Sequence, residues 1–421
     1  MSASRFTNVA LRRAIGIGTA LVVLAMVATA CSSTSASSTS GTLAGTPAAG
    51  LPSFYAVPSH LPSNKPGTVI KYQRVATPSI DGTVYRVMYV SESTTGKPIA
   101  VTGLVMVPKT PPPPGGYRVV TWGHGTNGMA PQCAPSLKPA TAVPLQNDLL
   151  EQGWEVTASD YQGEGTPGML PYLVGVLAAR NTIDIVRAAR NMKVAHASST
   201  YAVWGHSEGG QTALFALHIA QSYAPELHLV GVVAGAPPSQ FSVIYTFLKT
   251  SPYRFYLFMA EVGFNAGYGN AAAPLTEVLT SKALKLIPLL TKGCHTYLTL
   301  VHYSWAELGK ANPFDVPKWR TLVEENDPES FTTPSPVPLL IPQGGTDHQI
   351  PPISTQILTT HFCKIGQDVE RWIYPGKSHA GVIPYYMPDM IHWLSDRFAG
   401  DPNPDPYVPV GEPGVQTTTC P

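Results

Sequence analysis

The sequence has few charged residues. Asp, Glu, Lys and Arg together make up 13% of the 421 residues, about half the roughly 25% that is usual in globular proteins. The 27 basic and 26 acidic residues nearly cancel, which leaves a formal net charge of +1 at pH 7. No basic stripe of the kind that nucleic-acid-binding proteins carry is present, so we expect no nucleic-acid partner. The 42 prolines argue against coiled coils and long uninterrupted helices, because proline breaks a helix interior.

A long uncharged run stands at the amino terminus. Arg5, Arg12 and Arg13 precede 17 uncharged residues, Ala14–Ala30, which end in small side chains. This order of basic, apolar and small residues is typical of a cleaved signal peptide, and 17 residues are at the lower limit for a membrane span. We therefore expect residues 1–30 to be a signal peptide and the protein to be exported, to the outside of the cell or to the cell envelope.

The end of this run also resembles a bacterial lipoprotein signal. In that interpretation Ala28–Cys31 makes Cys31 the lipidated residue, which anchors the protein to a membrane. Cleavage after Ala30 by an ordinary signal peptidase is the alternative. Half of the residues from 31 to 50 are Ser or Thr, and such a segment has too little apolar surface to order itself. Residues 31–60 are expected to form a tether.

Alternating strands and helices dominate the middle of the chain. Three short β-rich runs come first, at 68–76, 83–91 and 99–107. Strands are then predicted at 118–122, 154–159, 201–204 and 229–234, and helices near 145–152, within 172–194 and over 208–222. This alternation predicts an α/β fold, with a mostly parallel central sheet and helices on both of its faces.

The alternation is interrupted once. It resumes with strands at 337–341 and 369–373 and helices near 353–364 and 382–398. The α/β core is therefore expected to comprise residues 61–238 and 336–400, with a Pro-rich tail at 401–421. The intervening segment, 239–335, is rich in aromatic and aliphatic residues. It predicts a mainly helical cap over the carboxyl edge of the sheet, where ligands bind in such folds.

The strongest chemical signal is a G-x-S-x-G motif, Gly205–Gly209, centred on Ser207. It lies between the strand at 201–204 and the helix over 208–222. In this context the two glycines allow a tight turn that projects the serine hydroxyl above the sheet. The amino terminus of the helix also offers backbone N–H groups to developing negative charge. We therefore predict that Ser207 is a nucleophile.

A serine nucleophile needs a general base, and the base needs an acid that orients it. In hydrolases with this motif, the acid and then the histidine follow the serine along the chain. Asp347 follows the strand at 337–341, and His379 follows the strand at 369–373. Asp347 and His379 are thus the predicted acid and base. The alternatives are that His348 is the base and that Asp347 only caps the next helix.

An oxyanion hole needs two backbone donors. One is expected from Glu208, the residue after the nucleophile. The other is expected from Gly125 or Thr126, in the loop 124–128 that follows the strand at 118–122. A Gly-rich turn without a catalytic role is the alternative.

Cysteine is rare. The spacing of the five cysteines matches no zinc site, so we expect no metal. With Cys31 set aside, four cysteines in an oxidising compartment indicate two disulfides with three possible pairings. We expect Cys133 to pair with Cys294, which would join the loop region to the cap, and Cys363 to pair with Cys420, which would hold the tail. Buried free thiols are the alternative.

Together these motifs resemble the α/β-hydrolase superfamily and, more closely, the bacterial branch of the secretory lipase family. The points of similarity occur in order across roughly residues 60–400. They are 103–108, 122–126, 160–163, 205–210, 235–238, 343–347 and 378–379. The resemblance implies a helical cap, hydrolysis of acyl lipids or smaller esters, and no cofactor.

The leading hypothesis is a secreted serine ester hydrolase, a lipase or carboxylesterase acting on small-molecule or lipid esters. Ser207 would attack the ester carbonyl, and water would hydrolyse the acyl-enzyme. An exported serine peptidase on the same fold is the alternative, but the cap has few charged groups to hold peptide termini. A binding protein with a relic site is the third hypothesis, and the ordered Ser, Asp and His argue against it.

Overall fold

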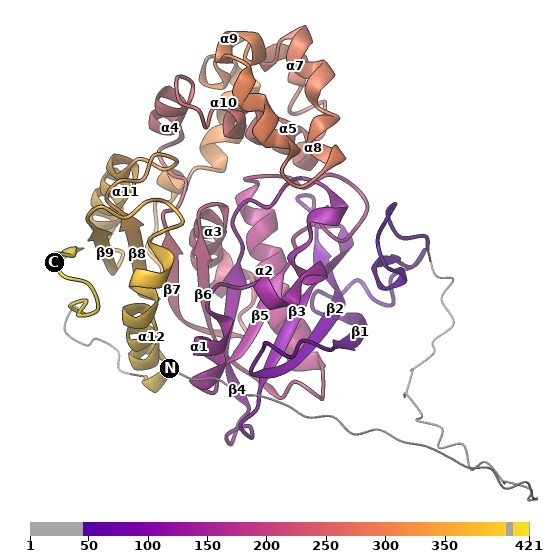
Figure 1. Ribbon diagram of the computed structural model, residues 1–421, viewed down its shortest axis with the longest axis vertical. Helices are drawn as coiled ribbons and strands as arrows, with labels where there is room; N and C mark the ends of the chain where they lie inside the picture. Colours follow the sequence, from indigo (N-terminus) through magenta and orange to yellow (C-terminus); the bar gives the residue numbers. More distant parts are fainter. Residues whose placement is uncertain (1–44, 401–406, 421) are drawn as a thin grey trace, which may run out of the picture. The chain divides into compact units, whose positions relative to one another are not determined.

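A computed structural model describes residues 45–400 and 407–420 (Figure 1). The expected signal peptide at 1–30, the lipidation site at Cys31 and the expected tether as far as residue 44 lie outside the described residues. Within the described ranges, no helix is both long enough and apolar enough to cross a membrane.

Ten strands of the described chain form a single sheet, in the order β1-β2-β3-β5-β4-β6-β7-β8-β9-β10. The pairs β1–β2, β2–β3 and β3–β5 are antiparallel, β5, β4, β6, β7, β8 and β9 are parallel, and β10 is an antiparallel edge strand. The prediction of an α/β fold with a mostly parallel sheet is therefore confirmed. The strands are β1 (Val69–Val75), β2 (Gly82–Glu92), β3 (Pro98–Pro108), β4 (Tyr117–Gly123), β5 (Glu155–Ser159), β6 (Ala197–His206), β7 (His228–Gly235), β8 (Leu339–Gly344), β9 (Val369–Tyr374) and β10 (Gln416–Thr419).

Helices cover both faces of the parallel part of the sheet (Figure 1). Successive residues of a strand point to opposite faces. Val120 and Ala202 accordingly pack with α1 and α12, whereas Val119 and Val203 pack with α2, α3 and α11. These helices are α1 (Gln146–Glu151), α2 (Gly175–Asn191), α3 (Glu208–Tyr223), α11 (Pro352–Ile365) and α12 (Ile383–Ala399).

The cap segment, which we define as residues 239–335, contains helices α4 to α10. They lie together at one end of the sheet (Figure 1). Buried aromatic and aliphatic side chains pack this segment, among them Phe258 and Trp319, and the cluster continues to Leu177 at the start of α2. The helices are α4 (Phe241–Leu248), α5 (Phe255–Tyr268), α6 (Leu275–Val278), α7 (Ser281–Leu286), α8 (Leu289–Lys292), α9 (Trp305–Leu308) and α10 (Pro317–Glu325).

The folded part begins earlier than the sequence predicted. The expected tether was 31–60, but residues 45–60 pack against the α/β core. Tyr55 is fully buried, and its hydroxyl forms a 2.7 Å hydrogen bond with the Ser136 hydroxyl. Leu51 is also buried. Burial of their apolar surface stabilises the folded segment. The Ser/Thr-rich residues before them have little such surface, so the boundary of the folded part follows this change in composition.

The expected Pro-rich tail, 401–421, contains a strand that the sequence did not predict. β10 pairs with β9 from Gln416 to Thr419. This strand is short, polar and exposed, so it has no alternating apolar pattern that would reveal it. Residues 401–406 and 421 lie outside the described part of the chain.

Two disulfides are present, with the pairing expected from the sequence. Cys133 is bonded to Cys294, which joins the loop after β4 to the cap segment. Cys363, in α11, is bonded to Cys420, which follows β10. A disulfide restricts the unfolded chain, and each typically contributes about 2–4 kcal/mol to the free energy of unfolding. The first bond therefore holds the cap segment to the core beside the loop 124–128.

Candidate active site

Ser207 occupies the sharp turn between β6 and α3. Its backbone has φ 61° and ψ −124°, a strained conformation for a residue with a side chain. The turn is possible because glycines surround it. A Cβ added to Gly205 would overlap the carbonyl oxygen of Gly209, and a Cβ added to Gly209 would overlap that of Gly123. Ser207 is thus presented at the carboxyl end of the central strands, as the motif predicted.

Asp347 lies in the loop after β8 and is almost completely buried. Its Oδ1 accepts hydrogen bonds from the backbone N–H groups of Gln349 (2.8 Å) and Ile350 (2.9 Å). Its Oδ2 accepts a 2.6 Å hydrogen bond from Nδ1 of His379. The carboxylate therefore has a fixed orientation, and one of its oxygens holds the imidazole.

His379 lies in the loop after β9 and is also buried. With Nδ1 directed at Asp347, Nε2 is the ring nitrogen that can act as a base. This Nε2 is buried and has no hydrogen-bonding partner among the described residues, and His379 lines the same cavity as Ser207. The other candidate base, His348, is exposed and lines neither cavity at Ser207. The structure thus brings Ser207, Asp347 and His379 together and leaves His348 apart.

Backbone contacts hold the acid loop against the histidine loop. The backbone N–H of Thr346 donates to the carbonyl of Lys377 (3.0 Å), and that of Gly345 donates to the carbonyl of Tyr374 (2.8 Å). A Cβ on Gly344 would overlap the Lys377 carbonyl oxygen. Glycine at 344 therefore permits the approach that places Asp347 beside the imidazole.

The predicted oxyanion residues also converge on Ser207. Glu208 is the first residue of α3, so its backbone N–H is at the helix amino terminus beside the serine. Gly125 lies next to the nucleophile, since a Cβ added to it would stand 3.6 Å from Cβ of Ser207. Gly125 and Thr126 line the cavity that contains Ser207 and His379.

The side chain of Glu208 has a second contact with this loop. Burial raises the pKa of the Glu208 carboxyl to about 8, and a hydrogen bond with the Thr126 side chain lowers it in part. The Thr126 hydroxyl is also 2.9 Å from the hydroxyl of Tyr172. From the sequence, Glu208 is expected to donate its backbone N–H, and its side chain flanks the serine. The contact through its carboxyl could not be foreseen because it joins segments far apart in the chain.

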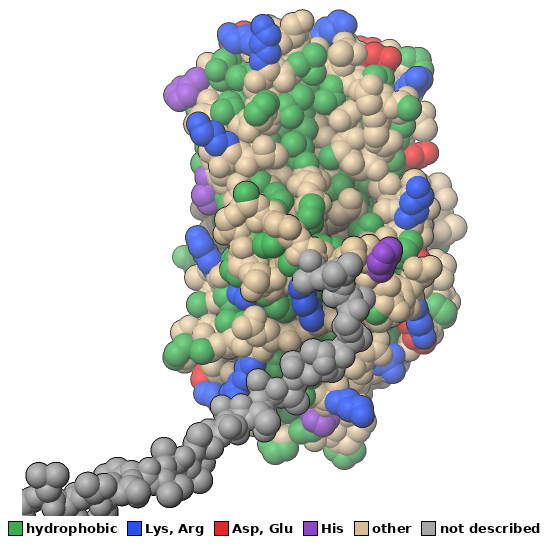
Figure 2. Space-filling view, turned by 90° about the vertical axis from the view of Figure 1, so that its right-hand side faces the viewer, with side chains coloured by type: hydrophobic (Ala, Val, Ile, Leu, Met, Phe, Trp, Pro, Cys, Tyr) green, Lys and Arg blue, Asp and Glu red, His purple; other side chains and the backbone are tan. Residues whose placement is uncertain are grey.

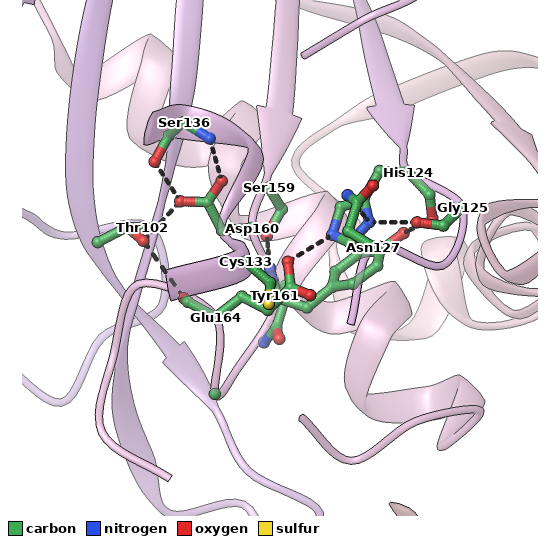
Figure 3. Close-up of polar contacts among 12 residues, drawn as sticks. Thr102, His124, Gly125, Asn127, Cys133, Ser136, Ser159, Asp160, Tyr161 and Glu164 are labelled. Carbon is green, nitrogen blue, oxygen red and sulfur yellow. Dashed lines mark hydrogen bonds and ion pairs between the residues drawn. The ribbon is translucent and has the colours of Figure 1, made fainter. Parts of the chain in front are cut away.

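A group of buried polar side chains packs against the loop 124–128 (Figure 3). Nδ1 of His124 is 2.8 Å from the carbonyl oxygen of Gly125, its Nε2 is 3.6 Å from a carboxylate oxygen of Glu164, and its ring stacks on Tyr161 at 4.1 Å. Burial lowers the pKa of His124 to about 4 and raises that of Glu164 well above its usual range. Burial therefore favours the neutral form of both groups.

Asp160 belongs to the same group and anchors the adjoining segment. Its Oδ1 accepts from the backbone N–H of Ser136 (2.8 Å), and its Oδ2 accepts from the hydroxyls of Ser136 (2.5 Å) and Thr102 (2.6 Å) (Figure 3). This carboxyl is fully buried, and it joins β3, the segment around Ser136 and the loop after β5. Its role is architectural.

Two cavities meet at Ser207. The first, the apolar cavity, is lined mainly by the cap segment and comprises about 750 Å³ of space between atoms, open solvent at its mouth included. The second, the wide cavity, is lined by the loop 124–127, His379 and the Cys133–Cys294 disulfide. Side chains that line both are Ser207, Tyr256 and Gln349, and the Tyr256 hydroxyl donates a 3.0 Å hydrogen bond to Oε1 of Gln349. A substrate bound at Ser207 can therefore place one part in each cavity.

The chain is similar to known proteins over much of its length. The secretory lipase family model matches residues 144–405, more than half of the chain. The chain belongs to the secretory lipase family. As members of that family are secretory proteins, this membership makes the protein an exported one.

Several curated proteins are similar over most of their length. The chain is 24% identical to a lipase A of Moesziomyces aphidis, with 82% of this chain and 79% of that protein aligned. It is 26% identical to a secreted triacylglycerol lipase of Malassezia globosa, over 83% of this chain and 81% of that protein. It is also 24% identical to a probable inactive lipase of Mycobacterium tuberculosis, over 84% and 83%.

Solved structures share the fold of this secretory lipase family member. Candida antarctica lipase A in its closed state superposes with a TM-score of 0.73 at 20% identity, covering 86% of this chain and 89% of that one. The rice cell wall degrading esterase of Xanthomonas oryzae gives a TM-score of 0.66 at 19% identity, covering 80% of this chain and all of its own.

Proposed function

We propose that this member of the family is an active serine ester hydrolase, a lipase or carboxylesterase. In the proposed reaction, Nε2 of His379 takes the hydroxyl proton of Ser207 as the serine oxygen attacks the ester carbonyl. The tetrahedral intermediate collapses as the imidazolium returns that proton to the departing alcohol. Water then attacks the acyl-enzyme with the same histidine as base, and Ser207 is released.

The other named residues have supporting roles in this proposal. Asp347 holds His379 in the tautomer that leaves Nε2 free and stabilises the imidazolium when it forms. The backbone N–H groups of Glu208 and of Gly125 or Thr126 would bind the oxyanion of the intermediate. Because the Glu208 donor lies at the first turn of α3, the partial positive charge of the helix terminus adds to the stabilisation.

The observation that carries the proposal is the His379–Asp347 contact of 2.6 Å with a buried, unpartnered Nε2 in the cavity of Ser207. A relic site would not need the acid, the base and the nucleophile to remain in this relation. Nothing in the comparisons favours the peptidase alternative, since the family and the similar proteins are lipases and esterases.

We further propose that the apolar cavity receives the acyl chain and the wide cavity the alcohol. Apolar side chains dominate the lining of the first cavity, among them Phe241, Ile244, Leu248, Phe264, Trp319 and Val323. Hydrophobic side chains also gather on the upper part of one face of the molecule (Figure 2), the end that the cap helices occupy.

A series of p-nitrophenyl esters with increasing acyl length tests this assignment. Each buried methylene is worth up to about 0.8 kcal/mol, so kcat/KM should rise several-fold per added methylene until the cavity is filled. Medium or long chains should exceed acetate, and aminoacyl amides should not be cleaved. A steady decline of kcat/KM from acetate onward would instead indicate a short pocket, and faster cleavage of the amides would favour the peptidase.

We also propose that the exported protein is held at the cell envelope by a lipid on Cys31. The support is the sequence Ala28–Cys31 and the Ser/Thr-rich segment that follows it. Cells expressing the full chain and fed a radiolabelled fatty acid should label the wild type and not a Cys31→Ser variant, which should appear in the medium. Equal release of both proteins, without label, would show that an ordinary signal peptidase acts after Ala30.

A further inference from the structure

The apolar cavity contains one buried carboxyl. Glu261 is the single charged residue of α5 (Phe255–Tyr268), and it lines the cavity that reaches Ser207. Its side chain is only 4% exposed. Neither of its carboxyl oxygens has a hydrogen-bonding partner among the described residues. Glu261 is not needed by the proposed catalytic groups, and sequence analysis did not select it, although one acid in an otherwise apolar helix was a visible signal.

Three tyrosines also line this cavity, and their hydroxyls differ in what they contact. The hydroxyl of Tyr172 is hydrogen-bonded to that of Thr126, and the hydroxyl of Tyr256 donates a hydrogen bond to Gln349. The hydroxyl of Tyr245 accepts a 3.0 Å hydrogen bond from Nε1 of Trp305, which leaves its own proton available.

Tyr245 also lies within the electrostatic reach of Glu261. The pKa of Tyr245 is raised first by burial, lowered in part by the Trp305 hydrogen bond, and raised again by the Glu261 carboxyl. The two side chains thus offer a group of hydrogen-bond donors and acceptors in a cavity whose walls are otherwise largely apolar.

A buried carboxyl without a partner is costly. Placing a polar group in an apolar environment without a hydrogen bond is unfavourable, because the hydrogen bonds that it made with water are lost. Burial raises the pKa of Glu261 well above its usual range, because an apolar environment favours the neutral acid over the carboxylate. A neutral carboxylic acid donates one hydrogen bond and accepts others, and these are the contacts that an alcohol or ketone oxygen requires.

We propose that Glu261 recognises an oxygen substituent, a hydroxyl or keto group, on the acyl chain of the substrate. This inference rests on the proposed ester hydrolysis and on the acyl chain occupying the apolar cavity. The oxygen would satisfy the Glu261 carboxyl, and the chain on either side of it would contact the apolar walls. A chain without the oxygen would leave the carboxyl unpaired.

The helix geometry places this contact away from the ester. Tyr256 lines both cavities and therefore stands near Ser207, whereas Glu261 lines only the apolar cavity. Five residues of α-helix separate them, a rise of about 7.5 Å. The recognised oxygen should therefore lie in the middle of the chain, several carbons from the ester carbonyl.

The test uses p-nitrophenyl decanoate, the same ester with a hydroxyl at successive mid-chain positions, and an ester with an amino group at the preferred position. With wild-type protein, kcat/KM for at least one hydroxy ester should exceed that for decanoate by about tenfold or more. In Glu261→Leu this ratio should fall to about one or below, because kcat/KM should rise for decanoate and fall for the hydroxy ester. Glu261→Gln, which keeps a donor and an acceptor, should retain most of the preference.

Two further measurements keep the test decisive. Glu277→Gln removes an exposed carboxyl of the same cap segment, and its ratio should equal that of wild type. Calorimetric binding of the intact esters to Ser207→Ala should show the same preference without turnover, so a failure of catalysis is distinguishable from a failure of recognition. Equal kcat/KM and equal binding for hydroxylated and plain chains, or a ratio unchanged in Glu261→Leu, would overturn the proposal. Preference for the amino ester would also overturn it, since it would identify an ionised carboxylate that binds a cation.

Discussion

Replacement of Ser207 or His379 by alanine is expected to lower kcat for ester hydrolysis by roughly 10³-fold or more. Ser207 supplies the attacking oxygen in the proposed reaction, and His379 is the buried imidazole with a free Nε2 in the same cavity. The measurement is the initial rate with the preferred p-nitrophenyl ester at saturating concentration. The double variant should be little worse than either single variant, because groups that act as a unit do not contribute additively.

The fold should survive these substitutions. Both residues are on loops at strand ends, so near-wild-type far-ultraviolet circular dichroism and cooperative unfolding are expected. His348→Ala is the matched control, since this exposed histidine is adjacent to Asp347 in sequence and lines neither cavity. It should retain most of the activity. A fully active His379→Ala combined with an inactive His348→Ala would reverse the assignment of the base.

Such a loss would also separate this protein from a relic enzyme of the same family. One similar protein, from Mycobacterium tuberculosis, is named a probable inactive lipase, so family membership alone does not establish turnover. What argues for activity here is local: Asp347 accepts two backbone N–H bonds and one imidazole N–H bond. Two of these donors hold the loop before α11, and the third is the imidazole, so the carboxylate is fixed in an orientation that serves the histidine.

Those parts of the structure that depend on short-range patterns could be predicted from the sequence. The period of apolar residues marks β6 and α3, and the glycines at 205 and 209 mark the turn between them. Parallel strands end at a common edge, which is why Asp347 and His379 could be placed near Ser207 without coordinates. The chain order of acid and histidine then selected them among the 12 histidines and 26 acidic residues.

The remaining features depend on long-range contacts that leave no periodic signal. The burial of Tyr55 depends on a hydrogen bond between its hydroxyl and that of Ser136, 81 positions later in the chain. The pairing of β10 with β9 likewise joins a polar segment to a distant strand. The Cys363–Cys420 disulfide links the residue after β10 to α11. Polar contacts inside the protein are the hardest to foresee. A single acid in a largely apolar helix, such as Glu261 in α5, is unusual, but the sequence does not show which cavity the carboxyl lines.

A large fall in kcat/KM is expected at alkaline pH, caused by ionisation of the Glu208 side chain. Burial raises the pKa of its carboxyl to about 8 from an ordinary 4.5, so the side chain is neutral at pH 7 and becomes a carboxylate above pH 8. The same residue offers its backbone N–H to the oxyanion. A negative charge at this position opposes the negative charge of the intermediate. In wild type, kcat/KM should therefore fall about tenfold per pH unit above pH 8, or about 100-fold by pH 10.

Glu208→Gln isolates this effect, because an amide cannot ionise and keeps a similar shape. Each variant is compared with its own maximum over pH 6–10, with the hydrolysis seen in Ser207→Ala subtracted. The alkaline decline should move upward by at least about one pH unit in Glu208→Gln, since the titrating group that produces it is gone. An alkaline limb identical in both proteins would assign the decline to another group.

The same pKa shift predicts a change in stability with a definite sign. The folded protein holds a proton on Glu208 up to about pH 8, whereas the unfolded chain releases it near 4.5. Between these values the folded state binds more protons, so this residue's contribution to the free energy of unfolding is greatest below about pH 4.5 and declines as pH rises to 8. Glu164 is buried nearby, and its pKa is raised by burial and then by Glu208, so wild type should lose stability over this range through both acids. The urea midpoint of Glu208→Gln should therefore exceed that of wild type at pH 8 by more than it does at pH 5. A constant difference between the two proteins across that range would contradict burial of the Glu208 proton as the cause.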